Sequence, residues 1–455
     1  MRLSPIPALA IAAILTLGLS AGCRRAPPDG IALVGATLID GSGGPALPDA
    51  VIVVRRGRVE SVGTRAEFQL PARTVQVELT GRWIIPGLID AHAHVERWAL
   101  PRYLRWGVTT VRDLHGALDS ILHLRSQVNL GAVTGPRIYS AGAMIDGLPT
   151  TYPDAIGANN TRDARKGVDR LVNAGVDLVK MYTRVEPALL REVIDEARTF
   201  NLRVTGHLGL TDAVAAARAG ISSIEHLTGV PEACMTATAS LYAAHYRGFF
   251  PGWTAFERSW GSLDSAALGW VAGELAARRT MLVPTLVLHE TFSRLGDPSV
   301  LQDTMLRAVP ELQQARWNVP DMVRRAGWTA QDYPVFRAAR PKQDLFVRLF
   351  AAAGGRIAAG TDASNQLLIP GYSEHREMEL LVGAGLSPRD ALLAATRNGA
   401  LILGVDSLGL LAPGKVADLV VLTRDPLADI RNTLAIDRVM SRGVLLSADS
   451  IRKAW

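Results

Sequence analysis

The stretch Ile85-Pro86-Gly87-Leu88-Ile89-Asp90-Ala91-His92-Ala93-His94 predicts a short apolar strand that ends in two histidines. Side chains alternate between the two faces of a strand, so His92 and His94 point the same way and Ala93 points away. Two neutral imidazoles side by side can begin a zinc-type site, but a complete site needs more ligands. The missing ligands must therefore come from other strand ends further along the chain.

The middle of the chain alternates predicted strands and helices from about residue 82 to residue 403. Counting the opening strand, eight segments have the pattern of strands. The seven later ones are 107–113, 137–142, 176–182, 202–207, 221–226, 280–287 and 355–362. This order predicts an α/β fold whose central domain, residues 84–404, is a (β/α)8 TIM barrel.

Two connections, residues 228–260 and 290–342, are longer than connections in such a domain usually are. Each follows a predicted strand. We therefore expect both insertions to lie over the mouth of the barrel, at the carboxyl ends of the strands, where they can cover a substrate.

The two ends of the chain share a different texture, with short β-branched runs separated by Gly, Pro and Asp. Neither end has enough strands for a stable sheet of its own. We expect residues 31–83 and 405–455 to combine into one small β-sandwich beside the barrel.

Composition narrows the possible classes of protein. The 455 residues are 48% hydrophobic and 20% charged, which is typical of a globular chain with a large core. The net charge of +6 is spread along the chain, so a nucleic-acid partner is not indicated. The only cysteines, Cys23 and Cys234, exclude a framework of disulfides.

The N-terminus predicts export. Arg2 precedes an apolar run, residues 6–19, of a length that suits a signal peptide. The run ends in Leu19-Ser20-Ala21-Gly22-Cys23, which resembles a bacterial lipoprotein signal, although the leucine lies four residues before the cysteine and not three. We expect a signal peptide over residues 1–23, lipidation at Cys23 and a tether over residues 24–30. Alternatives are an ordinary cleaved signal or an uncleaved anchor.

This prediction places the chain in the bacterial cell envelope, on the periplasmic face or as an outer-membrane lipoprotein, with the lipid as its only membrane contact. The alternative is a soluble periplasmic or secreted protein.

Polar side chains gather where the predicted barrel strands end, which is the face that carries the active site in TIM barrels. Four of the nine histidines lie there. The complete set at this face is His92, His94, Lys180, His207, His226 and Asp362.

These residues lie in stretches that resemble the amidohydrolase superfamily, in particular its imidazolonepropionase-like and prolidase-like hydrolases with two metal ions. The resemblance runs from about Ile31 to the C-terminus. It rests on the ordered combination of Pro86–His94, Gly107–Asp113, Val179–Tyr182, Thr205–His207, Ser223–His226, Ala359–Asp362 and 414–421.

The resemblance implies a role for each polar residue. His92 and His94 would bind the first, more buried metal ion, and His207 and His226 would bind the second. Lys180 would be carbamylated and bridge the two ions. Asp362 would ligate the first ion and act as the catalytic residue that carries a proton to the leaving amine. The two divalent ions, for which Zn suits these ligands, would share an activated hydroxide.

The chemistry of Lys180 follows from charge. A protonated lysine cannot bind a cation, whereas a carbamate is an anion that can bridge two ions. Formation of the carbamate requires a neutral amine, which burial favours. The rival interpretation is a single-metal site that Lys180 only supports.

Other polar residues near the strand ends are candidates for contact with substrate. Tyr182 and Arg184 follow Lys180, and the guanidinium could bind a substrate carboxylate. His289 and His115 could hydrogen-bond the substrate, and Asp113 could orient ligands.

We therefore expect a metal-dependent hydrolase that cleaves a C–N amide bond in a dipeptide or an N-acyl amino acid. Cyclic amide, lactone or phosphotriester hydrolysis could use the same site. An alternative of another class is an envelope binding protein on a catalytically dead scaffold, which the intact set of six residues disfavours. The sequence leaves a homo-oligomer open.

Overall fold

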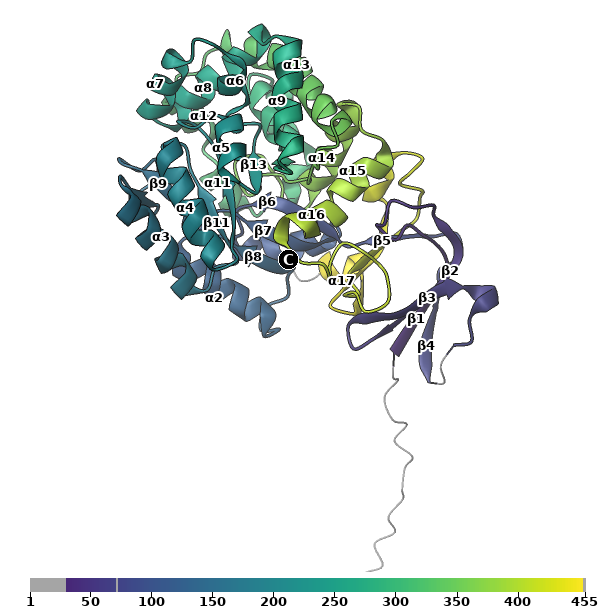
Figure 1. Ribbon diagram of the computed structural model, residues 1–455. Coiled ribbons are helices and arrows are strands. Elements are labelled where there is room, and N and C mark those ends of the chain that lie inside the picture. Colours follow the sequence, from purple (N-terminus) through teal and green to yellow (C-terminus); the bar gives the residue numbers. More distant parts are fainter. Residues whose placement is uncertain (1–29, 71–72, 453–455) are drawn as a thin grey trace, which may run out of the picture.

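The structure is a computed structural model that describes residues 30–70 and 73–452 (Figure 1). The predicted signal peptide, with Cys23, and residues 24–29 of the predicted tether lie outside the described residues and stay predictions. Gly30, the last residue of that tether, instead begins the first strand. Within the described ranges, no helix combines the length and the apolar character that a membrane crossing requires.

Both chain ends contribute strands to one mixed sheet beside the barrel (Figure 1). The strand order is β17-β16-β15-β5-β1-β2-β3, and β4 pairs in parallel with β1. These strands are β1 (Gly30–Leu38), β2 (Leu47–Arg55), β3 (Arg58–Thr64), β4 (Thr74–Glu78), β5 (Trp83–Pro86), β15 (Leu419–Leu422), β16 (Ile436–Ser441) and β17 (Val444–Ser447). The two ends meet where β5 pairs antiparallel with β15, with Ile85 opposite Val420. Buried β-branched and leucine side chains, Ile52 and Leu419 among them, fill the core of this domain.

Parallel strands form the wall of the barrel in two hydrogen-bonded groups, β6-β7-β8 and β10-β9-β11-β12-β13-β14. These strands are β6 (Leu88–Ala93), β7 (Val108–Asp113), β8 (Arg137–Ser140), β9 (Ile145–Gly147), β10 (Ile156–Ala158), β11 (Leu178–Met181), β12 (Arg203–Gly206), β13 (Ser223–Glu225) and β14 (Met281–Val283). The first seven predicted barrel strands are present, and the short strands β9 and β10 are additions that the sequence pattern did not predict.

Backbone hydrogen bonds close the gap between the two groups. On one side, the Asp177 N–H donates to the Ser140 carbonyl (2.9 Å), and the Tyr182 N–H donates to the Ile145 carbonyl (2.9 Å). The third predicted strand thus bends after β8 and continues as β9, which pairs with β11.

The eighth predicted strand closes the other side, although it has only isolated bridges and no regular strand. Ile357 bridges to Leu282 of β14, and Ala363 bridges to Ala93 of β6. In between, the Ala91 N–H donates to the Ala359 carbonyl (2.9 Å). Residues 355–363 therefore join the last strand to the first and complete the TIM barrel that the sequence predicts.

Helices surround the barrel and pack their apolar faces on its strands (Figure 1). They are α1 (Leu100–Arg105), α2 (Leu118–Asn129), α3 (Thr161–Ala174), α4 (Pro187–Thr199), α5 (Ala213–Ala219), α9 (Ser265–Ala277), α14 (Tyr372–Gly383), α15 (Pro388–Ala394) and α16 (Arg397–Leu403). The last helix, α17 (Ala448–Arg452), packs instead on α1 and on the strands β16 and β17. On α14, the buried His375 contacts the Thr433 hydroxyl and the Trp106 carbonyl, which ties the barrel to the C-terminal segment.

The two long connections are helical. The first contains α6 (Val230–Cys234), α7 (Ala239–Arg247) and α8 (Phe249–Ser259). The second begins within α10 (Leu286–Ser293) and ends about halfway along α13 (Asp332–Ala352). Between these two helices it contains α11 (Glu311–Arg316) and α12 (Val319–Ala326). Helices α7, α8 and α12 lie together at one end of the molecule (Figure 1), and both insertions contribute side chains to the cavity described below.

Gly360 allows the closing segment to approach β6. A Cβ atom at this position would lie 2.7 Å from the His92 backbone nitrogen and 2.7 Å from a Val283 methyl group. We expect Gly360→Ala to lower the free energy of unfolding by about 1–3 kcal/mol, because the rigid strands on both sides must separate. Urea unfolding measures this change.

Exposed Gly383 at the end of α14 gives the matched control, because a Cβ there meets nothing within 4 Å. Gly383→Ala should leave stability unchanged or slightly raised. Equal stability of the two variants would contradict the tight closure at Gly360.

Candidate active site

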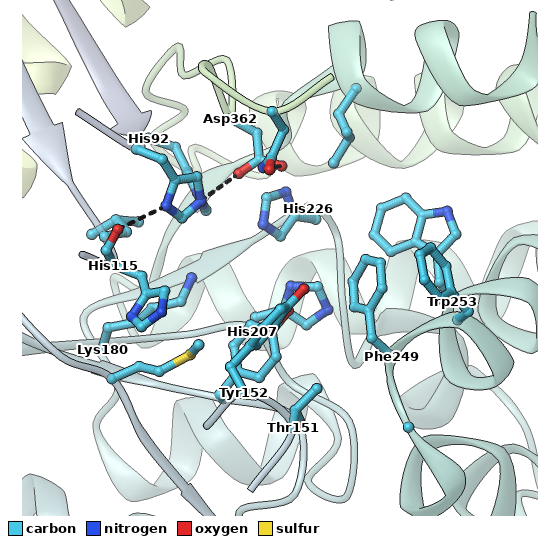
Figure 2. Close-up of a pocket in the computed structure, with 18 of the residues that line it drawn as sticks. His92, His115, Thr151, Tyr152, Lys180, His207, His226, Phe249, Trp253 and Asp362 are labelled. Atoms are coloured by element: carbon cyan, nitrogen blue, oxygen red, sulfur yellow. Dashed lines mark hydrogen bonds and ion pairs between the residues drawn. The ribbon is translucent and has the colours of Figure 1, made fainter. Parts of the chain in front are cut away.

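One cavity of about 540 Å³ opens where the barrel strands end (Figure 2). Every side chain that the sequence predicts as a metal ligand lines it, namely His92, His94, Lys180, His207, His226 and Asp362. His92 lies in β6 and His94 directly follows it, while Lys180 lies in β11. His207 and His226 directly follow β12 and β13, and Asp362 lies in the closing segment. The barrel thus brings together residues from five places in the chain.

The Asp362 carboxylate lies next to His92 and His226 at one side of this group (Figure 2). Its Oδ1 atom lies 3.1 Å from His92 Nε2 and 2.9 Å from His94 Nε2. His226 joins them, because ligand atoms of His92, His226 and Asp362 all lie within 4.8 Å of one another. His207 lies next in line, with its ring 4.8 Å from that of His226.

Two of these residues have strained backbones. His226 and Asp362 have φ values of 58° and 64°, in the left-handed region that residues other than glycine rarely adopt. Such conformations persist only where the surrounding structure enforces them, and they concentrate at functional sites.

Three histidines direct their Nε2 atoms toward the cavity because a protein oxygen binds Nδ1. His92 Nδ1 lies 2.7 Å from Glu225 Oε2, and His226 Nδ1 lies 2.7 Å from Thr285 Oγ1. His94 Nδ1 donates to the carbonyl of His115 (3.1 Å). Fixing Nδ1 in this way leaves Nε2 free to bind a metal ion.

Burial sets the charge of the donors. It lowers the pKa of His207 and His226 well below the usual value, so both imidazoles are neutral, as metal ligation requires. Burial alone would raise the pKa of Asp362, but hydrogen bonds from His92 and His94 outweigh it and hold that pKa well below its usual value.

Lys180 is 2% exposed, and burial lowers its pKa to about 8. A neutral amine is therefore accessible near neutral pH, which is the form that reacts with CO2. Four histidines, a carboxylate and a lysine that can become a carbamate fit a pair of divalent cations such as Zn.

A buried ion pair below the cavity supports His92. Arg112 Nη2 donates to Glu225 Oε1 (2.6 Å), while the other oxygen of Glu225 accepts from His92. Ser223 and Thr205 hydroxyls also donate to Glu225 Oε1. Burial would raise the pKa of Glu225, but Arg112 and His92 hold it far below its usual value.

Arg112 and Glu225 are not among the predicted site residues, although both lie in the stretches that carry the family resemblance. The alternation of side chains along β13 could have predicted the inward direction of Glu225. Ser223 and Glu225 share the face of this strand that points into the barrel, and a charge on that face of a central strand needs a partner.

Asp113 and His115 hold the loop that follows His94. Asp113 accepts from the Val95 N–H (2.9 Å) and from Ser140 Oγ (2.8 Å). The His115 ring lies on the cavity wall, where Nε2 pairs with Asp154 (3.2 Å). Burial lowers the pKa of His115 to about 4, so it faces the cavity as a neutral side chain.

His289 does not line the cavity, in contrast to the role in substrate contact that the sequence suggested. Its Nδ1 atom lies 2.5 Å from Glu257 Oε1, and its Nε2 atom donates to the His226 carbonyl (3.1 Å). Gln343 in turn donates to Glu257 Oε2 (3.0 Å). His289 therefore fixes the backbone of His226 from behind, and α8 and α13 hold it there.

Tyr182 and Arg184 line the cavity, as the sequence suggested. The Tyr182 ring lies 4.9 Å from that of His207. The insertions add residues that the sequence did not single out, because side chains on long connections have no periodic pattern that predicts their direction. These are Arg247, Phe249, Phe250, Trp253, Met322 and Arg325.

Comparison with known proteins identifies a family. The profile of the Amidohydrolase family matches residues 83–446. The imidazolonepropionase of Ruegeria pomeroyi is 26% identical over 392 residues, 82% of this chain and 88% of that protein.

Two solved structures extend the likeness. A putative prolidase from Bifidobacterium longum has a TM-score of 0.70 at 26% identity and covers 94% of this chain and 99% of its own. Bottromycin amidohydrolase has a TM-score of 0.73 at 25% identity, with coverage of 94% and 89%.

The support of His92 by Glu225 can be tested. Glu225→Gln removes the anion that orients His92, so we expect about a 10- to 100-fold loss of metal affinity. Titration of the chelator-treated protein with Zn²⁺, followed by calorimetry, measures the affinity.

Glu232→Gln is the matched control, because Glu232 also makes a buried 2.7 Å contact to a histidine, His245, but does not line the cavity. Metal affinity of Glu225→Gln equal to that of this control would show that Glu225 has no part in the site.

Proposed function

The chain belongs to the amidohydrolase family and is a hydrolase of carbon–nitrogen bonds, and from this premise we propose that it uses two divalent metal ions to cleave an amide of a small substrate. The substrate that we propose is a dipeptide or an N-acyl amino acid. The observation that carries the proposal is the convergence of six donor side chains on one cavity, with three imidazoles fixed through Nδ1.

The residues fit the proposed ions in number and in chemistry. His92, His94 and Asp362 would hold one ion, His207 and His226 the other, and carbamylated Lys180 would bridge the two. When bound, the ions would polarise the amide carbonyl and acidify water, which is the usual contribution of such pairs.

The protein supplies the proton transfer. Asp362 has one oxygen between the two histidines, and its other oxygen accepts a hydrogen bond from Asn365 Nδ2 (2.8 Å). This carboxylate takes a proton from the attacking water and returns it to the amine nitrogen as the C–N bond breaks. The same carboxylate therefore acts first as a base and then as an acid, and the proton balance closes within one turnover.

Two kinds of alternative remain, namely hydrolysis of another substrate class and binding without catalysis. A cyclic amide, a lactone or a phosphotriester could meet the same donor set. A catalytically dead binding protein does not need ligand histidines with fixed Nδ1 atoms or a buried lysine in the same cavity. The hydrogen bonds that orient these histidines therefore favour an enzyme over a binding protein.

Asp362→Asn tests the proton transfer. We expect turnover to fall by roughly 10²–10⁴-fold, because the amide cannot accept the proton. Metal content by mass spectrometry should stay near the wild-type value. The exposed Asp195→Asn on α4, which does not line the cavity, serves as a control for the change in charge. An unchanged rate in Asp362→Asn would remove Asp362 from the reaction.

Lys180→Ala tests the bridge. Without the carbamate, we expect the variant to bind less metal and to recover part of its metal and activity in acetate or propionate, which can occupy the space of the carbamate. Lys166→Ala, at an exposed position of α3, should change neither quantity. Full metal content and full activity of Lys180→Ala without added acid would exclude a bridging role.

A further inference from the structure

The charge of the cavity restricts what it can bind. Three arginines line it, Arg184, Arg247 and Arg325, against one carboxylate, Asp362. That carboxylate already accepts from two histidines and Asn365. An anionic group on the substrate therefore finds more partners of opposite charge here than an ammonium group does.

Arg184 is fixed on the barrel side of the cavity. Its backbone N–H donates to Asp146 Oδ1 (2.8 Å), and its Nη1 donates to the Pro149 carbonyl. Its guanidinium lies 6.0 Å from the centre of the Tyr246 ring. The Nε atom is buried and has no hydrogen-bond partner in the described part of the chain. A donor left without an acceptor next to the cavity indicates that a ligand can supply the acceptor.

Arg247 also lines the cavity, at the end of α7 in the first insertion. The following residue, Gly248, is so close to Arg184 that a Cβ there would lie 3.8 Å from Arg184 Nη2. Arg247 is exposed, and its guanidinium has no ion pair within the described residues. By contrast, Arg325 pairs with Asp321 (2.8 Å). Arg184 and Arg247 are therefore the two cavity arginines without an ion pair in the described part of the chain, and Gly248 places the end of α7 next to Arg184.

Aromatic side chains, among them Phe249 and Trp253, form a wall of the cavity beside the ligand histidines (Figure 2). The Phe249 ring stacks on that of Trp253 (5.8 Å) and contacts Phe250 (5.3 Å). Phe249 and Trp253 lie 6.0 and 6.1 Å from the His207 ring. A bulky apolar group bound against these rings would lie beside the reacting centre.

Resting on the proposed amide hydrolysis, we propose that the substrate is an amino acid acylated on nitrogen by a bulky apolar acid and not a dipeptide with a free amine. Arg184 and Arg247 bind its carboxylate, and Phe249, Phe250 and Trp253 bind the apolar group. The α-ammonium of a dipeptide would enter a cavity in which arginines outnumber carboxylates, and like charges would disfavour it there.

Three matched compounds test this proposal on the metal-loaded enzyme. N-(3-phenylpropanoyl)-L-alanine differs from L-phenylalanyl-L-alanine only by the missing amine, and its C-terminal amide lacks only the carboxylate charge. We expect kcat/KM for the acid to exceed that of the dipeptide and that of the amide by about 10- to 100-fold each.

Variants locate the charge effect. Arg184→Met and Arg247→Met should each reduce the preference for the acid over its amide by about tenfold, mainly through KM. Arg324→Met is the control, because this exposed arginine of α12 does not line the cavity. Because Arg247 is exposed, replacing it leaves the packing of the core unchanged, and the variant should fold. Calorimetric binding of the acid to chelator-treated protein gives a readout without turnover and should show the same losses.

The outcomes separate this inference from the proposed function. A dipeptide cleaved as well as the acid, or an unchanged preference in both arginine variants, overturns the inference while amide hydrolysis stands. If none of the three compounds is cleaved, amide hydrolysis of this class fails. Calorimetry then still decides whether Arg184 and Arg247 bind the carboxylate.

Discussion

The Asp362 carboxylate, held between His92 and His94, joins the closing segment of the barrel to its first strand. The same contact fixes three donors of the candidate site, so the closure of the fold and the assembly of the site depend on one interaction. Gly360 makes it possible, because only a residue without a side chain allows the closing segment to lie against the His92 backbone. The strained backbones of His226 and Asp362 lie at the same rim.

Polar groups inside a barrel are tolerated only when they are paired. Glu225 accepts from Arg112, Thr205, Ser223 and His92, so its charge is compensated although it is fully buried. His289 plays a corresponding part for His226, with Glu257 behind it. The donors at the rim are thus oriented by a second set of residues on the barrel strands and on the helices of the insertions.

Much of this arrangement follows from sequence patterns, because the donors stand at the ends of apolar strands and parallel strands end at one rim. His92, Lys180 and Asp362 could be placed together for that reason. Glu225 and Arg112 lie inside other barrel strands, β13 and β7, and only the alternation of side chains could have predicted their inward direction. His289 follows a predicted strand and still lies behind the wall, because α10 begins directly after β14 and turns it away. Arg247 and Trp253 belong to long connections, whose path depends on packing that no local pattern predicts.

The central claim is that these donors hold two cations bridged by Lys180. Its most direct test is a crystal structure of the Zn-loaded protein, with anomalous diffraction recorded at the zinc edge. We predict two anomalous peaks about 3.5–4 Å apart. One should lie near His92, His94 and Asp362 and the other near His207 and His226, with continuous density from the Lys180 side chain between them. A single peak, or peaks away from these residues, would contradict this account.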